Sequence, residues 1–334
     1  DFGFISVTGG SAVGQNGSTS EGADAIAALN GDNIIIAGED ADRVTVGNGN
    51  NAIAADLASV TFNTTTRATE FVRATAVAQD GADSITAGSG DNAIVGGGST
   101  DTVSVTGGND IILGDFGTID LTTGQVSSAA TPGEAADSIT ATDGNNIIVT
   151  GGAADRIDVG NGNNAILSDS GTVNFNASTR AALDLTSTAL NLDASDSVTA
   201  GTGNNAIILG GDTDSISATG GSDIILGDSG SISLTAGLAT QTSDFNPGND
   251  SIAALNGDNI ILAGGFADDI AVGNGNNAIV TDTGTIAFDA ASRATQVLTS
   301  ATDTRDGTDS VTAGTGNNAM ILGGDDDAVS VTGG

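Results

Sequence analysis

The stretch Val105–Thr118 reads VTGGNDIILGDFGT, and it joins a glycine turn, an acidic residue and a short apolar strand within about one nonapeptide. The same pattern recurs around it at Asp83, Asn92, Asp101 and Asp110, which are nine residues apart, and an aliphatic residue follows each of them two positions later. The sequence therefore predicts a turn and a strand every nine residues.

Composition sets limits on what such a chain can be. Its 334 residues include 51 Gly and 9 Phe but no Trp, Tyr or Cys, so we expect a thin aliphatic core without disulfides. The net charge of -35 means strong self-repulsion unless cations are bound, and it argues against nucleic acid as a partner. We predict no signal peptide and no membrane span, because no apolar run approaches ~18 residues.

A longer repeat is superimposed on the nonapeptides. The motif Asp-x-(Ile or Val) begins at Asp24, Asp83, Asp137, Asp196, Asp250 and Asp309, so a longer and a shorter spacing alternate along the chain. We therefore expect one continuous solenoid over 1–334, with modules 24–82, 83–136, 137–195, 196–249 and 250–308 and partial modules 1–23 and 309–334. The shorter module would make three 18-residue turns, and the longer one would add a five-residue loop.

The strands between turns are short and rich in Ile, Val, Ser and Thr, which is typical of β-structure. Alternation points Ile85, Ile94 and Ile112 into a narrow aliphatic lumen and points Ile111 and Leu113 outward. An exposed apolar strip along one broad face would result, and we interpret it as a contact surface unless loops cover it. The opposite face would expose Ser and Thr.

The third turn of each longer module carries a Phe and an Arg at fixed positions. The pairs are Phe62 and Arg67, Phe175 and Arg180, and Phe288 and Arg293. We expect the Phe to fill the lumen. The Arg either neutralises nearby carboxylates or is a solvated loop residue.

With an 18-residue turn, one edge of the solenoid becomes acidic and the other mostly amide. The acidic edge carries Asp24, Asp42, Asp83, Asp101, Asp137, Asp155, Asp196, Asp214, Asp250, Asp268, Asp309 and Asp327. Ahead of each third turn, where this column loses its Asp, stand Asp56, Asp115, Asp169, Asp228 and Asp282, which we expect to continue the column. The amide edge carries Asn33, Asn51, Asn92, Asp110, Asn146, Asn164, Asn205, Asp223, Asn259, Asn277 and Asn318.

Stacked carboxylates need a partner. Asp83 and Asp101 would lie about 4.8 Å apart, where they repel unless a cation lies between them, and Ca²⁺ suits carboxylate and carbonyl oxygens. The alternative is that each Asp makes an Asx turn with its own loop amides. On the amide edge we favour a column of Asn residues that hydrogen-bond from turn to turn.

The segments Gly88–Ile94, Gly107–Leu113 and Gly220–Ile225 resemble the RTX, or haemolysin-type, calcium-binding nonapeptide family, Gly-Gly-x-Gly-x-Asp-x-(apolar)-x, although no unit here is a complete match. The resemblance implies an all-β, right-handed parallel β-roll, an extracellular or cell-surface location, and Ca²⁺ held by loop carbonyls and Asp carboxylates. The expected ligands are all the aspartates named above for the acidic edge and for the positions ahead of the third turns.

For function, we expect a structural region of a secreted, calcium-stabilised fibre, surface layer or giant adhesin that associates with other copies of itself, laterally or end to end. Two alternatives are a ligand-binding solenoid such as an ice-binding adhesin region and a polysaccharide-acting β-helix enzyme. The chain lacks His, Lys, Tyr and Cys, which argues against an enzyme. Two successive modules form a super-repeat, and the first and last residues of the chain fall at nearly the same position within it. We therefore expect an excerpt of a longer chain or one link of an end-to-end stack.

Overall fold

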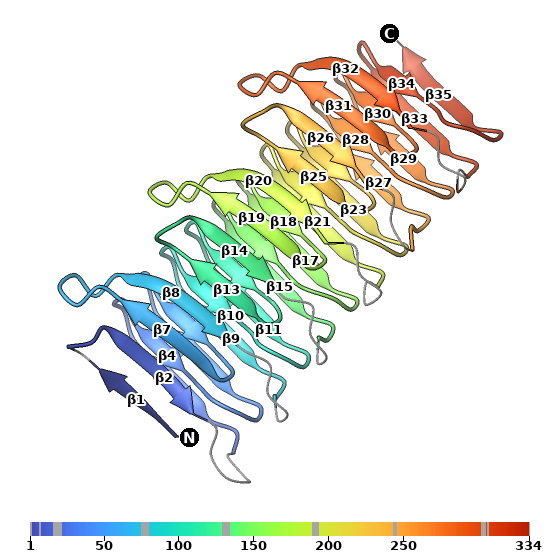
Figure 1. Cartoon of the computed structure of the whole chain (residues 1–334). Coiled ribbons are helices and arrows are strands. Elements are labelled where there is room, and N and C mark those ends of the chain that lie inside the picture. The colour runs from blue at the N-terminus through green and yellow to red at the C-terminus, as the bar shows by residue number, and fades with distance from the viewer. Residues whose placement is uncertain are drawn as a thin grey trace.

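The computed structural model describes residues 2–6, 8–15, 22–74, 80–128, 134–188, 194–242, 246–301, 305 and 307–333. The described residues form a long three-sheet stack along one axis, with the two termini at opposite ends (Figure 1). Repetition explains this shape, because each short strand finds its partner one turn further along the same axis.

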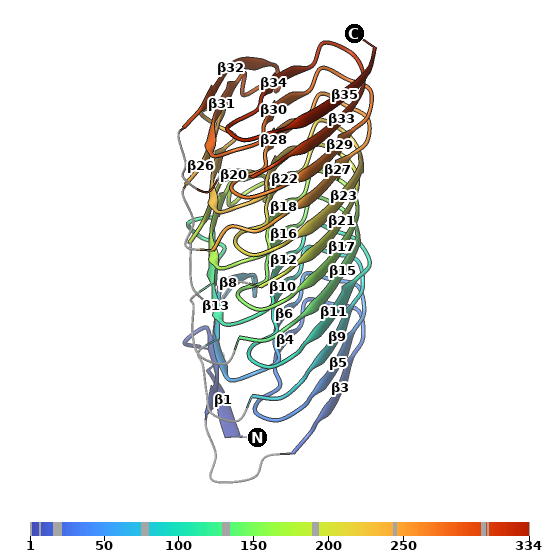
Figure 2. The same cartoon turned by 90° about the vertical axis from the view of Figure 1, so that its right-hand side faces the viewer.

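The first parallel sheet runs the length of the molecule, on the right in Figure 2. Its strands are β3 (Ala25–Ala28), β5 (Arg43–Val46), β9 (Ser84–Ala87), β11 (Thr102–Val105), β15 (Ser138–Asp143), β17 (Arg156–Asn161), β21 (Ser197–Thr202), β23 (Ser215–Gly220), β27 (Ser251–Ala254), β29 (Asp269–Val272), β33 (Ser310–Thr315) and β35 (Ala328–Gly333). Alternation makes one side of this sheet aliphatic and the other rich in Ser and Thr.

The second parallel sheet faces the first and is built from three-residue strands. They are β4 (Ile34–Ile36), β6 (Ala52–Ala54), β10 (Ala93–Val95), β12 (Ile111–Leu113), β16 (Ile147–Val149), β18 (Ala165–Leu167), β22 (Ala206–Ile208), β24 (Ile224–Leu226), β28 (Ile260–Leu262), β30 (Ala278–Val280) and β34 (Ala319–Ile321). Strands of the two sheets alternate along the chain, and Ala25 pairs with Arg43, its counterpart one 18-residue turn later. The prediction of an all-β parallel β-roll with 18-residue turns is confirmed.

A third sheet, the hairpin sheet, is antiparallel and covers the outer face of the second parallel sheet. Its strands are β1 (Phe2–Ser6), β2 (Ser11–Gln15), β7 (Ala58–Phe62), β8 (Thr69–Ala74), β13 (Gly117–Asp120), β14 (Gln125–Ser128), β19 (Gly171–Phe175), β20 (Ala182–Ser187), β25 (Gly230–Ser233), β26 (Leu238–Gln241), β31 (Gly284–Phe288) and β32 (Thr295–Ser300). From β7–β8 onward each hairpin follows two turns of the roll, and neighbouring hairpins pair with each other. The expected third turn with a five-residue loop is therefore wrong, since that segment is a hairpin outside the roll.

Two apolar layers result. The inner core lies between the parallel sheets and contains Ile85, Ile94 and Ile112, so the predicted aliphatic lumen is present. The outer core lies between the second parallel sheet and the hairpin sheet, where Ile111 and Leu113 are fully buried against hairpin side chains such as Ile119. The expectation that Ile111 and Leu113 form an exposed strip is wrong, because the chain covers that strip with its own hairpins.

The phenylalanines lie in the outer core as well. Phe62, Phe175 and Phe288 are buried there, at the ends of β7, β19 and β31. They do not fill the lumen as expected, since the inner core has room only for facing aliphatic rows. They belong to the same buried cluster as the small Ala residues of the second parallel sheet.

Candidate calcium sites along the acidic edge

The acidic edge is the set of loops that lead from the second parallel sheet or a hairpin into the first parallel sheet. Each predicted ladder aspartate stands immediately before a strand of that sheet, as Asp83 stands before β9 and Asp101 before β11. The in-register pairing of those strands brings the aspartates of successive turns side by side. Register alone therefore builds a column of carboxylates.

Hydrogen bonds link this column from turn to turn. The main-chain N–H of Asp83 donates to Oδ1 of Asp101, and that of Asp101 donates to Oδ1 of Asp137, both at 2.8 Å. The same bond, at 2.6 to 3.0 Å, joins Asp24, Asp42, Asp83, Asp101, Asp137, Asp155, Asp196, Asp214, Asp250, Asp268, Asp309 and Asp327 in order. The alternative, in which each Asp binds its own loop amides, is wrong for these Oδ1 atoms.

The hairpins change which aspartates are neighbours. Asp42 stacks directly on Asp83, 41 residues later, and Asp101 stacks on Asp137, 36 residues later, because the intervening hairpin leaves the roll. The column is therefore continuous, with no turn that lacks an Asp. The aspartates ahead of the hairpins were expected to continue this column. That expectation is wrong, because they lie beside the column.

The second carboxylate oxygens are the unusual feature of the column. The side chains of Asp83, Asp101 and Asp137 are 3%, 1% and 3% exposed. Their Oδ2 atoms are buried and have no hydrogen-bond partner in the structure, as is also true of Asp42, Asp155, Asp214, Asp250 and Asp268. A buried carboxylate oxygen without a partner is costly, so each of these positions requires a proton or a cation.

The aspartates ahead of the hairpins add a second row of carboxylates. Oδ2 of Asp56 accepts the N–H of Gly98 at 2.7 Å, and Oδ2 of Asp228 accepts the N–H of Gly265 at 2.8 Å. Asp169 makes the same contact with Gly211 at 2.9 Å, and Asp115 and Asp282 lie against Gly151 and Gly323. These side chains occupy the space beside loop glycines, where a Cβ would overlap them.

This packing explains the glycine pairs of the acidic edge. A Cβ on Gly97 would overlap the Asp56 carboxylate, and the residue has a φ of 126°, a conformation that L side chains rarely adopt. The glycine thus permits both the turn and the close approach of a carboxylate from the loop that leads into the preceding hairpin. The two rows lie side by side because Asp56 follows β6 at the same edge at which the ladder aspartates precede the strands of the first parallel sheet.

Burial and mutual repulsion hold these carboxyls against ionisation. Burial raises the pKa of Asp137 and of Asp250 to about 7, although each accepts a main-chain hydrogen bond that acts in the opposite direction. Burial, reinforced by neighbouring carboxylates, raises the pKa of Asp101 to about 10 and that of Asp115 to about 11. A positive charge placed among these carboxyls would lower their pKa values.

The local donor set fits a hard cation. Beside the Cα of Gly96, the space that a Cβ would fill is lined by Oδ2 of Asp101 and the carbonyl oxygen of Gly114 on the adjacent turn. Gly114, with Asp137 and Thr150, and Gly227, with Asp250 and Ala263, repeat this arrangement. Among the described residues no three acidic side chains could hold a metal ion by themselves, so carbonyl oxygens would have to complete each site.

Asp80 and Glu134 also belong to this edge and were not predicted. The charge of Asp80 contributes to the raised pKa of Asp56 and of Asp83, and that of Glu134 contributes to the raised pKa of Asp115. Both stand three positions before a ladder aspartate. This shared spacing could have identified both residues from the sequence, but the sequences that follow the hairpins do not repeat regularly enough to make it stand out.

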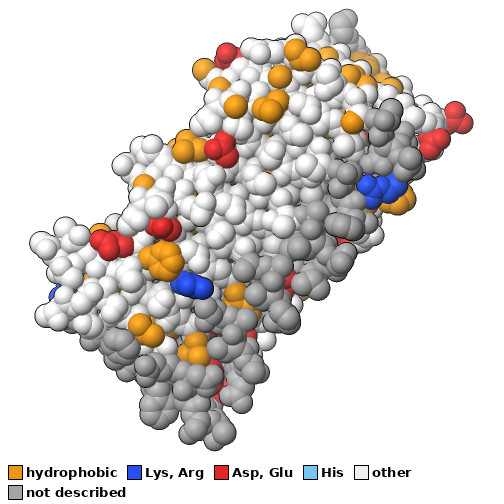
Figure 3. Space-filling model, viewed as in Figure 1, with side chains coloured by type: hydrophobic (Ala, Val, Ile, Leu, Met, Phe, Trp, Pro, Cys, Tyr) orange, Lys and Arg blue, Asp and Glu red, His pale blue; other side chains and the backbone are white. Residues whose placement is uncertain are grey.

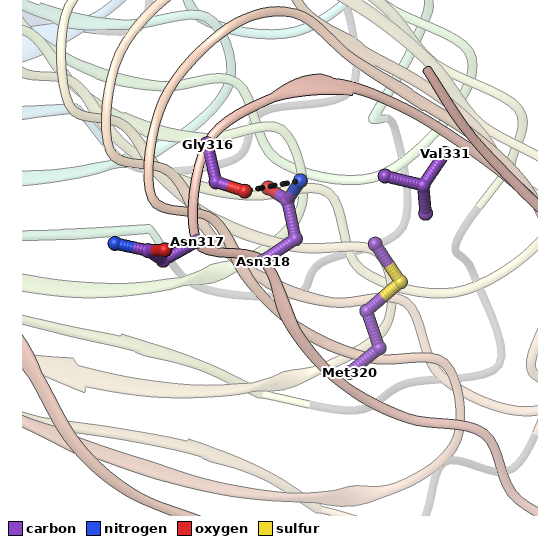
Figure 4. Close-up of a pocket in the computed structure, with 5 residues that line it drawn as sticks. All are labelled: Gly316, Asn317, Asn318, Met320 and Val331. Atoms are coloured by element: carbon purple, nitrogen blue, oxygen red, sulfur yellow. Dashed lines mark hydrogen bonds between the residues drawn. The ribbon is translucent and has the colours of Figure 1, made fainter. Parts of the chain in front are cut away.

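The amide edge behaves as expected, as a hydrogen-bonded column of Asn side chains. Nδ2 of Asn51 donates to Oδ1 of Asn92 at 2.8 Å and to the carbonyl oxygen of Gly49, in its own loop, at 2.9 Å. At the far end of the column, Nδ2 of Asn318 donates to the carbonyl oxygen of Gly316, beside a pocket lined by Met320 and Val331 (Figure 4). Neutral amides satisfy both the loop and the next turn, so this edge requires no cation where it carries Asn.

Fold and site together define a parallel β-roll with one edge lined by buried carboxylates. The model of the RTX calcium-binding nonapeptide repeat matches the chain in four copies, at residues 18–53, 77–112, 132–166 and 192–231. The chain thus carries repeats of the RTX calcium-binding nonapeptide family, whose repeats bind calcium ions. The matches fall on the two-turn units of the roll and leave out most of each hairpin.

No curated protein matches the chain. None of the described segments is a helix of the length and apolarity needed to cross a membrane. RTX-repeat proteins are typically secreted, and their repeats typically have structural and calcium-binding roles.

Proposed function

We propose that the chain is a calcium-stabilised structural rod of an extracellular fibre, surface layer or giant adhesin. The observation that supports this most directly is the uninterrupted column of buried carboxylates along one edge. Calcium there would supply the positive charge that balances the carboxylates. Because the sites do not exist in the unfolded chain, calcium binding would contribute directly to the stability of the folded chain. The same interaction would recur at every turn, as a stiff rod requires.

In this reading, the ladder aspartates would hold calcium together with carbonyl oxygens of the adjacent turn, and the aspartates ahead of the hairpins would complete the acidic surroundings. Calcium would supply positive charge and oxygen coordination, not a reaction step. The chain's own residues set the spacing through strand register, keep water away from the second carboxylate oxygens and leave room at Gly96, Gly114 and Gly227.

Association with other copies remains part of the proposal, through a different surface. The apolar strip is covered, whereas the outer face of the hairpin sheet, which faces the viewer in Figure 3, shows few charged side chains. A row of hydroxyl side chains crosses it in register: Thr118, Ser127, Thr172, Thr186, Ser231, Thr240, Thr285 and Thr299. In a chain of charge -35 such a face permits lateral contact between copies with little repulsion.

Small-angle X-ray scattering during a calcium titration of the full chain tests the rod. We expect a folded but more flexible chain in calcium-free buffer at pH 8 and a rigid rod at saturating calcium. A scattering curve that calcium does not change would contradict the proposal. For the lateral contact, sedimentation velocity should show that Thr172→Asp with Thr240→Asp reduces association, whereas Ser84→Asp with Ser197→Asp, on the first parallel sheet, serves as the control.

A further inference from the structure

The amide edge changes character at two positions. Asp110 and Asp223, which occupy equivalent places in successive super-repeats, replace Asn in the column, and both are fully buried. Oδ1 of Asp110 accepts the N–H of Asn92 at 2.9 Å and its Nδ2 at 2.8 Å, whereas Oδ2 has no hydrogen-bond partner. Oδ2 of Asp223 is in the same situation. Each therefore places a buried carboxylate in a column that otherwise consists of neutral amides.

By motif alone, these two loops would be calcium candidates. Gly107-Gly108-Asn109-Asp110 and Gly220-Gly221-Ser222-Asp223 each carry a glycine pair and an aspartate, and they are among the segments that resemble the nonapeptide repeat. Calcium at Asp110 and Asp223 is the expectation that follows from the motif. The structure places a different cation there.

That cation is an arginine at the tip of a hairpin in the next longer module. Nη1 of Arg180, between β19 and β20, donates to the carbonyl oxygens of Asn92 at 3.0 Å and Asn109 at 2.9 Å. These carbonyls lie on adjacent turns, 88 and 71 residues earlier in the chain. The guanidinium thus bridges two turns beside Asp110.

Arg293 repeats the arrangement one super-repeat later. Its Nη1 donates to the carbonyl oxygens of Asn205 at 3.0 Å and Ser222 at 2.6 Å, and its Nη2 donates to that of Asn204 at 3.0 Å. In both cases the charge of the arginine lowers the pKa of the neighbouring aspartate, against the stronger effect of burial. The charge and the carbonyl contacts are those that a bound cation would supply.

Arg67 provides a natural comparison within the chain. It stands at the same hairpin position, with φ of 66° against 55° for Arg180 and 56° for Arg293. Its side chain is nevertheless exposed and lies over the ring of Phe62, 5.6 Å from the centroid. An aspartate that preceded Arg67 by as many residues as Asp110 precedes Arg180 would fall before residue 1. The described residues therefore hold no aspartate that corresponds to Asp110 for Arg67.

We propose that Arg180 and Arg293 are built-in counter-cations for Asp110 and Asp223, so that these two motif loops bind no calcium. Each arginine also fastens its hairpin tip to the preceding modules. The inference rests on the proposed function in one respect, namely that calcium binds at the acidic edge. It divides the RTX loops of this chain into calcium-dependent loops on one edge and arginine-compensated loops on the other.

Calcium stoichiometry of the full chain, measured by isothermal titration calorimetry, tests the first part. Asp110→Asn with Asp223→Asn should bind as many calcium ions as the unmodified chain, whereas Asp101→Asn with Asp214→Asn should bind fewer. A loss of calcium ions in the Asp110 and Asp223 double variant would overturn the inference.

Thermal unfolding in calcium-free buffer tests the second part. Arg180→Gln should lower the melting temperature by several degrees, and Arg67→Gln should change it little. Adding Asp110→Asn to Arg180→Gln should recover most of the loss, since the neutral side chain no longer needs a counter-charge. If Arg180→Gln costs the same with Asn at position 110, the pairing is refuted. This arm needs no calcium, so failure at the acidic edge would be distinguishable from failure of the arginine proposal.

Discussion

In calcium-free buffer the folded chain should become more stable as the pH falls from 8 to 4. Asp137 provides the magnitude: burial raises its pKa from 3.8 to about 7, because the ionised form is desolvated in the folded chain. A carboxyl that binds its proton more tightly when folded contributes stability below pH 3.8, and that contribution is lost as the pH rises through 7. For one such group the difference is about 4 kcal/mol.

Calcium should reverse this dependence. Protons and calcium compete for the same carboxylate oxygens, so the calcium-saturated chain should lose stability as the pH falls. We expect the two curves of melting temperature against pH, followed by circular dichroism with metal-stripped and calcium-saturated protein, to converge or cross in the acid range. The convergence arises because acid stabilises the calcium-free chain while it weakens calcium binding.

A matched pair of variants separates the column from the general charge effect. Asp137→Asn and Asp32→Asn each remove one negative charge, but Asp137 is buried in the column and Asp32 is exposed on the amide edge. At pH 8 without calcium, Asp137→Asn should stabilise the chain and reduce its pH dependence, and Asp32→Asn should have a small effect. A calcium-free melting temperature that stays constant or falls between pH 8 and pH 4 would refute the reasoning.

Three further predictions concern the ligand and the two cores. Chelation at pH 8 should lower the melting temperature markedly, and a β-sheet spectrum and melting curve indifferent to excess chelator would contradict the calcium assignment. Ile111→Ala, in the outer core, should reduce the free energy of unfolding by about 2–5 kcal/mol, as Ile112→Ala in the inner core should, whereas an effect below about 1 kcal/mol at Ile111 would mean that the hairpins do not cover it. Gly97→Ala should destabilise the acidic edge in chemical denaturation, because its Cβ would overlap the Asp56 carboxylate; Asp56→Ala in the same chain should relieve part of the cost, and unchanged stability of Gly97→Ala would argue against that contact.

The sequence by itself determined the elements that depend on local periodicity. Strand alternation has a period of two, so the inward position of Ile112 could be predicted from its neighbours alone. The 18-residue turn likewise brought Asp83 and Asp101 together, because in-register parallel strands stack identical positions. The Asn column followed from the same argument, since stacked amides satisfy one another without any other partner.

Tertiary structure alone decided what lies on the outside of the roll. Asp120 and Gly124 give the segment around Ile119 a local turn signal, but nothing local shows that the resulting hairpin packs outside the roll against Ile111. That one difference buries the strip expected to be exposed and places Asp42 against Asp83, 41 residues away. Arg180 donates to the carbonyl oxygen of Asn92, 88 residues earlier in the chain. The nonapeptide period does not specify which residues meet across such a separation. Such contacts depend on how whole hairpins pack, and packing is a property of the assembled layers.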